Sequence, residues 1–290
     1  MAGSRFQSNK VFTGTNAERV ALITFNVRVG DKFLESDTGA MYEWTGTFWL
    51  QIELPNVSSS LDIAKGLIAG HSVIFTPSAN TDIGLTEEDV DDDGGTFVDL
   101  TSAQSLEILS SDAADASAGT GARTVQIETL DANHVTVIQT ATLNGTTPVA
   151  LTGTHLRARR MIVITAGSGG ENAGILTLRV VAGQTMLSAL ASNNRSYSSR
   201  YTVPADKTAF LTRFLITVGK GQDAVCRLMF RPDGQVFISG APLNVYQNDL
   251  QRPFPVFLSF AGKTDIKFTA ISTNTGTDVS VTYDIILVDD

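Results

Sequence analysis

The chain has 290 residues, of which 42% are hydrophobic and 18% are charged, and this is enough to bury a substantial core in one or two domains. Its formal net charge of −9 argues against a nucleic-acid partner, because binding phosphates requires a basic face. No apolar run approaches the roughly 20 residues of a membrane helix, and the single cysteine, Cys226, excludes an internal disulfide framework. We therefore expect neither nucleic acid nor a membrane among the partners of this protein.

Two segments of different character begin the chain. Residues 1–20 are polar and show neither helical nor strand periodicity, so we expect an extended arm whose only anchors are Phe6, Val11 and Phe12. In residues 21–54, short alternating segments are separated by Asp-Thr-Gly and Thr-Gly-Thr, and glycine permits the positive φ of tight hairpin turns. This second segment predicts a small module of aromatic β-hairpins through which the protein attaches.

Large aromatic side chains dominate this module. Tyr42 and Trp44 alternate with Met41 and Glu43, which places both rings on one face of a strand. A sheet this small cannot bury enough surface with aliphatic groups alone, although stacked rings also suit the apolar face of a sugar. We favour a role in structure or docking over sugar binding. The predicted attachment residues are Phe6, Phe12, Phe33, Tyr42, Trp44, Phe48 and Trp49.

The rest of the chain is a short linker followed by strands. Residues 55–70 are rich in Pro and Ser at their start and then suit a short helix, with Ser60 as its N-cap and Gly70 after its end. Beyond them, apolar segments alternate with clusters of Gly, Asn, Asp or Pro, which is typical of a sandwich or barrel. We predict an all-β fold, a small N-terminal aromatic β-hairpin module followed by a jelly-roll-like antiparallel β-sandwich or by two. Residues 71–150 would form a β-rich domain or the first half of a sandwich, and residues 151–290 a C-terminal sandwich.

The most acidic segment, "TEEDVDDDGG", contains half of a calcium-binding motif. Asp89, Asp91 and Asp93 precede Gly94 in the D-x-D-x-D-G order that opens a calcium loop. The twelfth position holds Leu100 where a bidentate Glu is required, and no pair of helices flanks the loop. We therefore favour a solvated acidic loop, or one that faces a basic groove on a neighbouring subunit. We expect no cofactor, with calcium at the three aspartates as the alternative.

Basic residues gather in "RARR". Strand alternation would place Arg157 and Arg159 on one face, where they could pair with an acidic loop of a neighbouring copy or with an acidic shell. An ordinary strand edge whose charges block unwanted pairing is the alternative. We favour an intersubunit role for Arg157, Arg159 and Arg160.

No catalytic motif is present in the sequence. The three histidines, His71, His134 and His155, belong to no HExxH, GxSxG or zinc-binding pattern. The segment "AGSGGENAG" lacks the GK[ST] of a phosphate-binding loop, so we interpret it as a mobile hairpin loop. We therefore expect that the protein is not an enzyme.

Several stretches resemble bacteriophage proteins. Residues 30–52 resemble the element GD-x-F-x-T-DTG-x-x-Y-x-W-x-G-T-x-W of phage virion proteins. Residues 119–151, 201–214 and 262–270 resemble segments that recur in tailed-phage structural proteins. The match in the first stretch rests on Gly30, Asp31, Phe33, Asp37, Thr38, Gly39, Tyr42, Trp44, Gly46, Thr47 and Trp49, with Ser36 where Thr is common. The resemblance implies a β-sandwich virion component, commonly homotrimeric, on the head or in tail fibres.

These observations converge on an assembled protein. Charged residues are scarcer than in an average soluble domain, which suggests that copies of the chain or a larger assembly cover part of its surface. We expect an oligomeric capsid decoration (cement) protein or a short head fibre, made in the host cytoplasm and carried on the virion surface. Its partners would be further copies in a homotrimer and the major capsid protein or a tail or portal-vertex component. The alternative is a tail fibre or receptor-binding adhesin that recognises a host surface glycan or protein.

Overall fold

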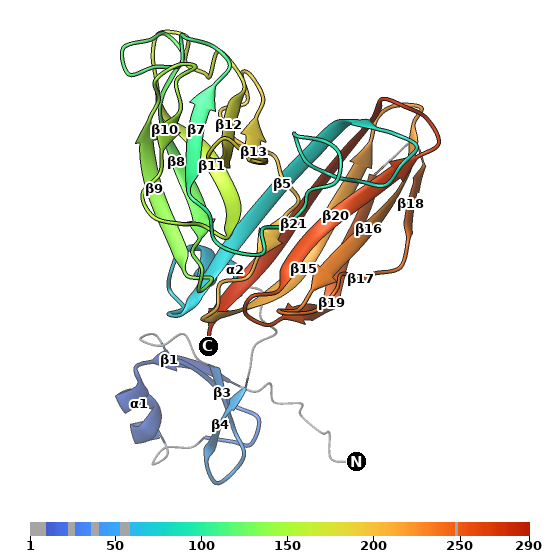
Figure 1. Ribbon diagram of the computed structural model, residues 1–290. Coiled ribbons are helices and arrows are strands. Elements are labelled where there is room, and N and C mark those ends of the chain that lie inside the picture. Colours follow the sequence, from blue (N-terminus) through green and yellow to red (C-terminus); the bar gives the residue numbers. More distant parts are fainter. Residues whose placement is uncertain (1–9, 23–26, 36–40, 53–58, 247–248) are drawn as a thin grey trace, which may run out of the picture. The chain divides into compact units, whose positions relative to one another are not determined.

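The computed structural model describes residues 10–22, 27–35, 41–52, 59–246 and 249–290. The chain divides into two compact units, residues 1–67 and 68–290 (Figure 1). No helix in the described stretches is long and apolar enough to cross a membrane.

The N-terminal unit contains a four-stranded sheet with the order β1-β2-β3-β4. The strand bounds are β1 (Val11–Gly14), β2 (Lys32–Glu35), β3 (Met41–Trp44) and β4 (Trp49–Ile52). β1 runs parallel to β2, whereas β3 is antiparallel to both β2 and β4. The turn between β3 and β4 holds Gly46 at a φ of 101°, a conformation that glycine adopts without strain. The predicted aromatic hairpin module is thereby confirmed.

Part of the expected arm is folded into this unit. Helix α1 (Asn16–Ala21) begins with a capping box in which Thr15 and Glu18 satisfy one another's backbone N–H groups. The prediction of an extended arm is therefore wrong for residues 11–20, because β2 offers β1 an edge to pair with. Residues 1–9 lie outside the described residues. A second short helix, α2 (Ser59–Ala64), lies in the predicted region, but it includes Ser60, the predicted N-cap, and ends six residues before Gly70.

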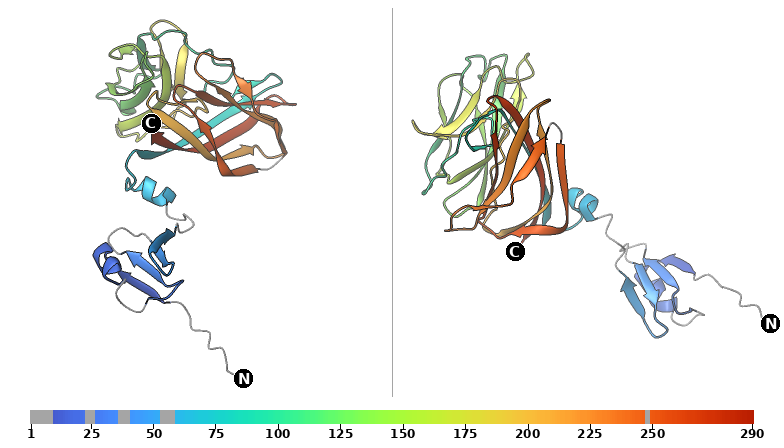
Figure 2. Two further views of the ribbon diagram at one scale, coloured as in Figure 1. Left: turned by 90° about the horizontal axis from the view of Figure 1, so that it is seen from below. Right: turned by 90° about the vertical axis from the view of Figure 1, so that its right-hand side faces the viewer.

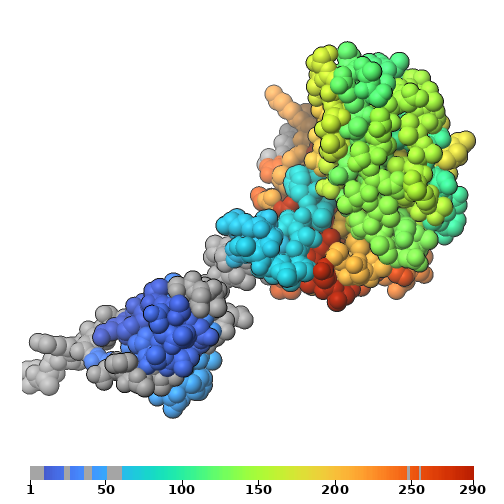
Figure 3. All heavy atoms as spheres, turned by 90° about the vertical axis from the view of Figure 1, so that its left-hand side faces the viewer, coloured from blue at the N-terminus to red at the C-terminus, as the bar shows by residue number. Residues whose placement is uncertain are grey.

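Two β-sandwiches form the C-terminal unit (Figure 2). We call the one built from β7 to β13 the inserted sandwich; its sheets have the orders β10-β7-β12-β13 and β11-β8-β9. The C-terminal sandwich has sheets β19-β15-β21-β5 and β14-β20-β16-β17, with β6 paired to β20 and β18 paired to β16. Figure 3 shows a face of this unit over which the inserted sandwich lies in green. All strand pairs described in the unit are antiparallel, which confirms the predicted fold class.

The strands of the inserted sandwich are β7 (Leu106–Ser110), β8 (Ala122–Leu130), β9 (Thr136–Thr142), β10 (Val149–Ala150), β11 (Arg157–Ala166), β12 (Leu176–Val180) and β13 (Thr185–Ala189). Those of the C-terminal sandwich are β5 (His71–Ile83), β6 (Glu88–Asp89), β14 (Tyr201–Thr202), β15 (Lys207–Val218), β16 (Asp223–Arg231), β17 (Ile238–Ser239), β18 (Leu243–Tyr246), β19 (Asp249–Phe260), β20 (Asp265–Ser272) and β21 (Thr277–Asp289).

The inserted sandwich interrupts the sequence of the C-terminal one. β5 and β6 precede it, but β5 pairs along its length with β21 at the end of the chain, His71 opposite Val288. The expected division into residues 71–150 and 151–290 therefore differs from the sheets, since β11, β12 and β13 complete the inserted sandwich. Pairing between strands so distant in sequence leaves no mark on local periodicity, which is why the sequence does not reveal this boundary.

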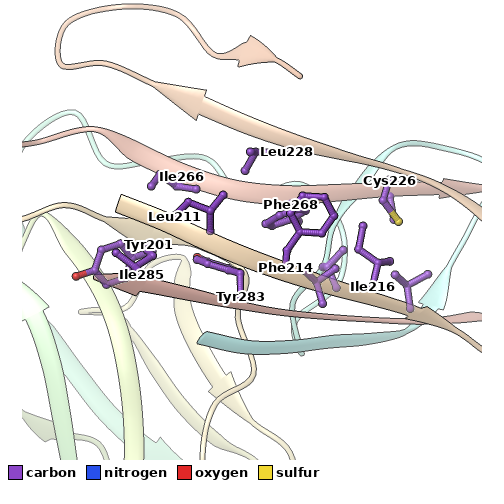
Figure 4. Close-up of a cluster of buried hydrophobic side chains, with 14 of the residues drawn as sticks. Tyr201, Leu211, Phe214, Ile216, Cys226, Leu228, Ile266, Phe268, Tyr283 and Ile285 are labelled. Carbon is purple, nitrogen blue, oxygen red and sulfur yellow. The ribbon is translucent and has the colours of Figure 1, made fainter. Parts of the chain in front are cut away.

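Each sandwich has its own apolar core. In β21, alternate residues point inward, as expected for a strand with one buried face, and these are Val279, Val281, Tyr283, Ile285 and Leu287. Phe214 and Phe268, from the two sheets of the C-terminal sandwich, have ring centroids 5.5 Å apart (Figure 4). Cys226 is buried in the same core. The inserted sandwich buries Ile108, Ile127, Met161, Leu176 and Leu178.

Candidate functional site

The largest aromatic residues of the N-terminal unit form its own core. Phe33, Trp44 and Trp49 are all buried. The ring centroids of Phe33 and Trp49 are 5.9 Å apart, and those of Trp44 and Trp49 are 5.3 Å apart. Such contacts stabilise by about 0.5–1.5 kcal/mol beyond the buried area. These three side chains hold the module together and, contrary to the prediction, are not presented for docking.

The other aromatic residues predicted for attachment differ in exposure. Phe12 and Tyr42 are partly buried against the core, and the Arg19 guanidinium lies 3.8 Å from the Tyr42 ring centroid. Phe48, in the turn that precedes β4, is 55% exposed, and Leu50 of β4 is half exposed as well. Phe6 lies outside the described residues. Phe48 is thus the predicted residue that the module offers most openly to a partner.

A network of ion pairs joins the two sandwiches, and we call this region the seam. Arg157 of β11 reaches Asp265 of β20 with Nε–Oδ1 and Nη2–Oδ2 distances of 2.9 and 3.1 Å. Arg231 and the Thr202 hydroxyl also donate to Asp265, and Asp99 lies 3.5 Å from Arg157. Burial acts to raise the pKa of Asp265, but the hydrogen bonds from Arg157 and its neighbours hold this pKa below its ordinary value. The predicted intersubunit role of Arg157 is therefore replaced by a contact within one chain.

The other two arginines of "RARR" bind the same acidic partner. Arg159 pairs with Glu128 and donates to the Tyr201 hydroxyl at 3.1 Å, and Arg160 lies 2.8 Å from Glu128. A β-bulge between Ala158 and Arg160 interrupts the alternation that the sequence suggests. The Arg159 side chain is 5% exposed and that of Arg160 is 40% exposed, so of the two Arg160 is the one more open to another subunit.

The acidic loop directs its carboxylates to cations of the same chain. Asp89 Oδ1 lies 2.6 Å from Lys267 Nζ, Asp91 pairs with Arg200, and Asp93 is 3.9 Å from Arg200. Asp89 and Asp91 are buried and therefore not solvated as expected, and cations of the same chain take the place of the basic groove that a neighbouring subunit was the alternative to supply. Within the described ranges, no group of three or more His, Cys, Asp or Glu side chains is arranged to hold a metal ion. Calcium at this loop stays the untested alternative to the expectation of no cofactor.

Asp92 in this loop has an unusual protonation equilibrium. Its carboxylate accepts a hydrogen bond from the Tyr197 N–H at 2.9 Å, but unlike Asp89 and Asp91 it forms no ion pair with any residue that the structure describes. Burial, together with the charges of Asp93 and Asp91, raises the pKa of Asp92 to about 7. The loop therefore changes charge near neutral pH.

The histidines occupy structural positions. His155 and Thr129 are both almost fully buried, with Nδ1 and Oγ1 2.8 Å apart, which leaves no room for a substrate beside this pair. Buried His134 lies in a turn at a φ of 60°, and His71 Nδ1 lies 3.0 Å from the Ala69 carbonyl oxygen. None of these contacts orients a base toward an accessible nucleophile.

Buried polar groups hold the glycine-rich segment "AGSGGENAG", which the sequence predicts to be mobile. Asn172 is fully buried and donates to the carbonyls of Gly174 and Leu190, both at 2.8 Å. Asp115, also fully buried, accepts hydrogen bonds from the backbone N–H groups of Ala122, Ala173 and Gly174. The loops at this end of the inserted sandwich are therefore fixed to one another.

Sequence reasoning missed Asp265, the acidic residue that β20 contributes to the seam, and Lys267 of the same strand, which pairs with Asp89. Both are buried in a strand whose other positions are largely apolar. Their spacing was the available signal: Asp265 and Lys267 lie two residues apart and so share one face, opposite the core face of Ile266 and Phe268. Two buried charges on one face of a strand indicate that something charged covers that face.

Comparison with known proteins finds matches only among solved structures. No protein-family model and no curated protein matches the chain. A solved structure of infectious bursal disease virus, Gx strain, is 11% identical and has a TM-score of 0.19, with 75% of this chain and 76% of that chain covered. The crystal structure of the STIV MCP is 8% identical with a TM-score of 0.19, covering 73% and 96% of the two chains. The infectious bursal disease virus VP2 subviral particle is 10% identical with a TM-score of 0.17, covering 76% and 72%. These matches are to proteins of viral particles, at TM-scores too low to carry an argument about this chain.

Proposed function

We propose that this protein is a non-enzymatic structural component of a virion, an oligomeric capsid decoration protein or short head fibre that attaches through its N-terminal unit. The observation that carries the proposal is the division into a small unit with an aromatic core and a large unit of two sandwiches. A separate small unit suits attachment, and rigid sandwiches suit display. The resemblance of residues 30–52 to an element of phage virion proteins supports the same assignment.

The attachment surface would include the exposed apolar side of the β3–β4 hairpin. Phe48 and Leu50 are each at least half exposed, and burying such side chains against a partner contributes about 1.5–3 kcal/mol apiece. The major capsid protein, or a component of the tail or portal vertex, would supply the complementary surface.

The oligomer would form through β19. This strand lies at the edge of its sheet, and its consecutive residues Val256, Phe257 and Leu258 are 83%, 47% and 39% exposed. The register with β15 shifts between Leu258 and Pro253, so Val256 and Phe257 lie in an irregular part of the edge that exposes apolar side chains. Exposed apolar edges are typically covered by another chain. We assign this edge to contacts with the other two copies of the protein in a closed homotrimer.

The test is to compare the full chain with a variant that begins at Ile68. Both proteins should be soluble and have the same oligomeric state in light scattering, but only the full chain should join virus particles when both are produced during infection. The matched control is Lys65→Ala in the full chain, which should join particles normally. Normal incorporation of the shortened variant would contradict attachment through the N-terminal unit.

A receptor-binding adhesin is the second candidate, and the fixed loops around Asp115 favour it, because recognition residues commonly lie on loops held by a rigid scaffold. The number of copies in a low-resolution map of the particle separates the two candidates. On the order of hundreds of copies would support shell decoration, and about a dozen would support a tail or vertex position.

A further inference from the structure

A groove between the two sandwiches brings three arginines together. Arg159 and Arg160 come from β11, and Arg195 comes from the connection that leads to β14. Glu128 of β8 and Phe75 of β5 also line the groove. The seam thus has an accessible side at which residues from both sandwiches meet.

The charges in this groove do not balance. Glu128 is the single acidic residue among its lining side chains, and it is shared by Arg159 and Arg160. Arg195 forms no ion pair with any residue that the structure describes; its nearest ring is that of Tyr197, 5.7 Å from the guanidinium carbon. Burial, together with the neighbouring charge of Arg160, lowers the pKa of Arg195. Two positive charges therefore remain uncompensated here, in a protein with a net charge of −9.

Two of these guanidinium groups each have one buried donor atom without an acceptor. The Nε atoms of Arg159 and Arg195 are buried and have no hydrogen-bond partner among the described residues, although the Arg159 side chain is only 5% exposed. A buried donor without an acceptor costs about 1–3 kcal/mol, and more when the group is charged. This cost is offset when a water molecule, an ion or a ligand supplies the acceptor.

We propose that this groove binds one oxyanion, the carboxylate or phosphate group of a small ligand such as an acidic sugar. The planar guanidinium groups of Arg160 and Arg195 match two oxygens of such a group and would supply the missing countercharge. Phe75 is 51% exposed at the side of the groove, and its ring offers an apolar surface for the remainder of the ligand. This inference is independent of the proposed attachment and oligomerisation.

Titration of the full-length protein with three related sugars tests the proposal. Glucuronate carries a carboxylate, glucose 6-phosphate carries a phosphate, and glucose carries neither. In calorimetry or saturation-transfer NMR at low ionic strength, at least one of the two anionic sugars should bind with a dissociation constant on the order of millimolar, at least about tenfold more tightly than glucose. Binding of glucuronate alone assigns the group to a carboxylate, and binding of glucose 6-phosphate alone assigns it to a phosphate.

Matched arginine variants locate the binding. Arg195→Gln should weaken binding of the anionic sugar by about tenfold or more. Arg252→Gln should not change binding, because Arg252 is exposed on β19 and its substitution removes the same charge outside the groove. Arg160→Gln is a second groove variant with the same expected loss, should Arg195→Gln fold poorly by circular dichroism. The proposal is overturned if neither anionic sugar binds better than glucose, or if a folded groove variant binds as the unaltered protein does.

Discussion

Arg157 and Asp265 form a two-point ion pair between the two sandwiches, although 108 residues separate them in the chain. Each side chain is about one-tenth exposed, so the pair is shielded from solvent and screened little by salt. Hydrogen bonds from Thr202 and Arg231 use the remaining capacity of the carboxylate. The inserted sandwich is therefore held at a defined place by a satisfied polar network in addition to apolar contact.

Removing one partner of this pair should destabilise the C-terminal unit strongly. Arg157→Gln leaves the buried Asp265 carboxylate with fewer donors, which we expect to lower the free energy of unfolding by about 3–5 kcal/mol. The measurement is urea denaturation followed by far-UV circular dichroism. Arg160→Gln, on the same strand but 40% exposed, is the matched control and should cost about 1 kcal/mol or less. Equal effects of the two variants would show that Asp265 does not depend on Arg157.

Asp92→Asn should alter the dependence of stability on pH. The pKa of Asp92 is raised to about 7 in the folded chain, above the value of about 4 expected when unfolded. Between pH 4 and 7 the folded protein therefore holds a proton that the unfolded chain releases, so this group makes stability fall as pH rises through that window. Asp92→Asn should match the unaltered protein near pH 4 and exceed it at pH 8, by about 1 kcal/mol. Thermal denaturation at both pH values checks this, and a difference that does not grow with pH refutes the assignment.

Local patterns in the sequence were sufficient for the fold class and for the position of the aromatic module. Alternation in β21 and the glycine turn at Gly46 are properties of neighbouring residues, so they can be read from one segment at a time. The pairing of β5 with β21 and the insertion of one sandwich into another depend on contacts between distant segments, and no local pattern encodes them. This explains why the expected boundary at residue 150 differs from the sheets.

The partners of the site residues could not be predicted for the same reason, because they lie far away in the sequence. The sequence identified Arg157 and Asp91 as members of charged clusters but placed their partners on other subunits, because Asp265 and Arg200 lie more than 100 residues away in the chain. The sequence identified the aromatic residues of the module, of which Phe33, Trp44 and Trp49 form its core. Nothing in the alternation of Tyr42 and Trp44 distinguishes a face turned to a core from a face turned to a partner.

Calcium should leave the stability of the protein unchanged. To bind at the acidic loop, the ion would have to displace Lys267 from Asp89 and Arg200 from Asp91, and the loop lacks the bidentate Glu of a complete site. We expect the melting temperature in 1 mM calcium chloride to equal that in 1 mM magnesium chloride within about 1 °C, since a ligand stabilises only when it exceeds its dissociation constant. A calcium-specific rise that Asp93→Asn abolishes would instead establish the loop as a calcium site.

A charge placed on the β19 edge should dissociate the proposed oligomer. Val256→Glu introduces a carboxylate where a second copy would bury an apolar side chain, and an unpaired charge in such an interface is strongly unfavourable. Val236→Glu is the matched control, because Val236 is similarly exposed, at 79% against 83%, but lies in the turn before β17. Light scattering should give a monomer for the first variant and the unaltered mass for the second. A monomeric unaltered protein, or a Val256→Glu variant of unaltered mass, would contradict the role of β19.

The N-terminal unit should unfold separately from the sandwiches, and tryptophan fluorescence should isolate this transition. Both tryptophans of the chain, Trp44 and Trp49, lie in that unit, whereas circular dichroism is dominated by the strands of the larger one. Because a small unit buries less apolar surface, its transition should occur at a lower urea concentration. Phe33→Ala, which removes a ring packed on Trp49, should shift the fluorescence transition by about 3–5 kcal/mol and leave the dichroism transition in place. Phe48→Ala, at an exposed position, should shift neither one. Coincident transitions that move together in Phe33→Ala would mean that the two units fold as one, and the small unit could not then serve as an independent attachment module.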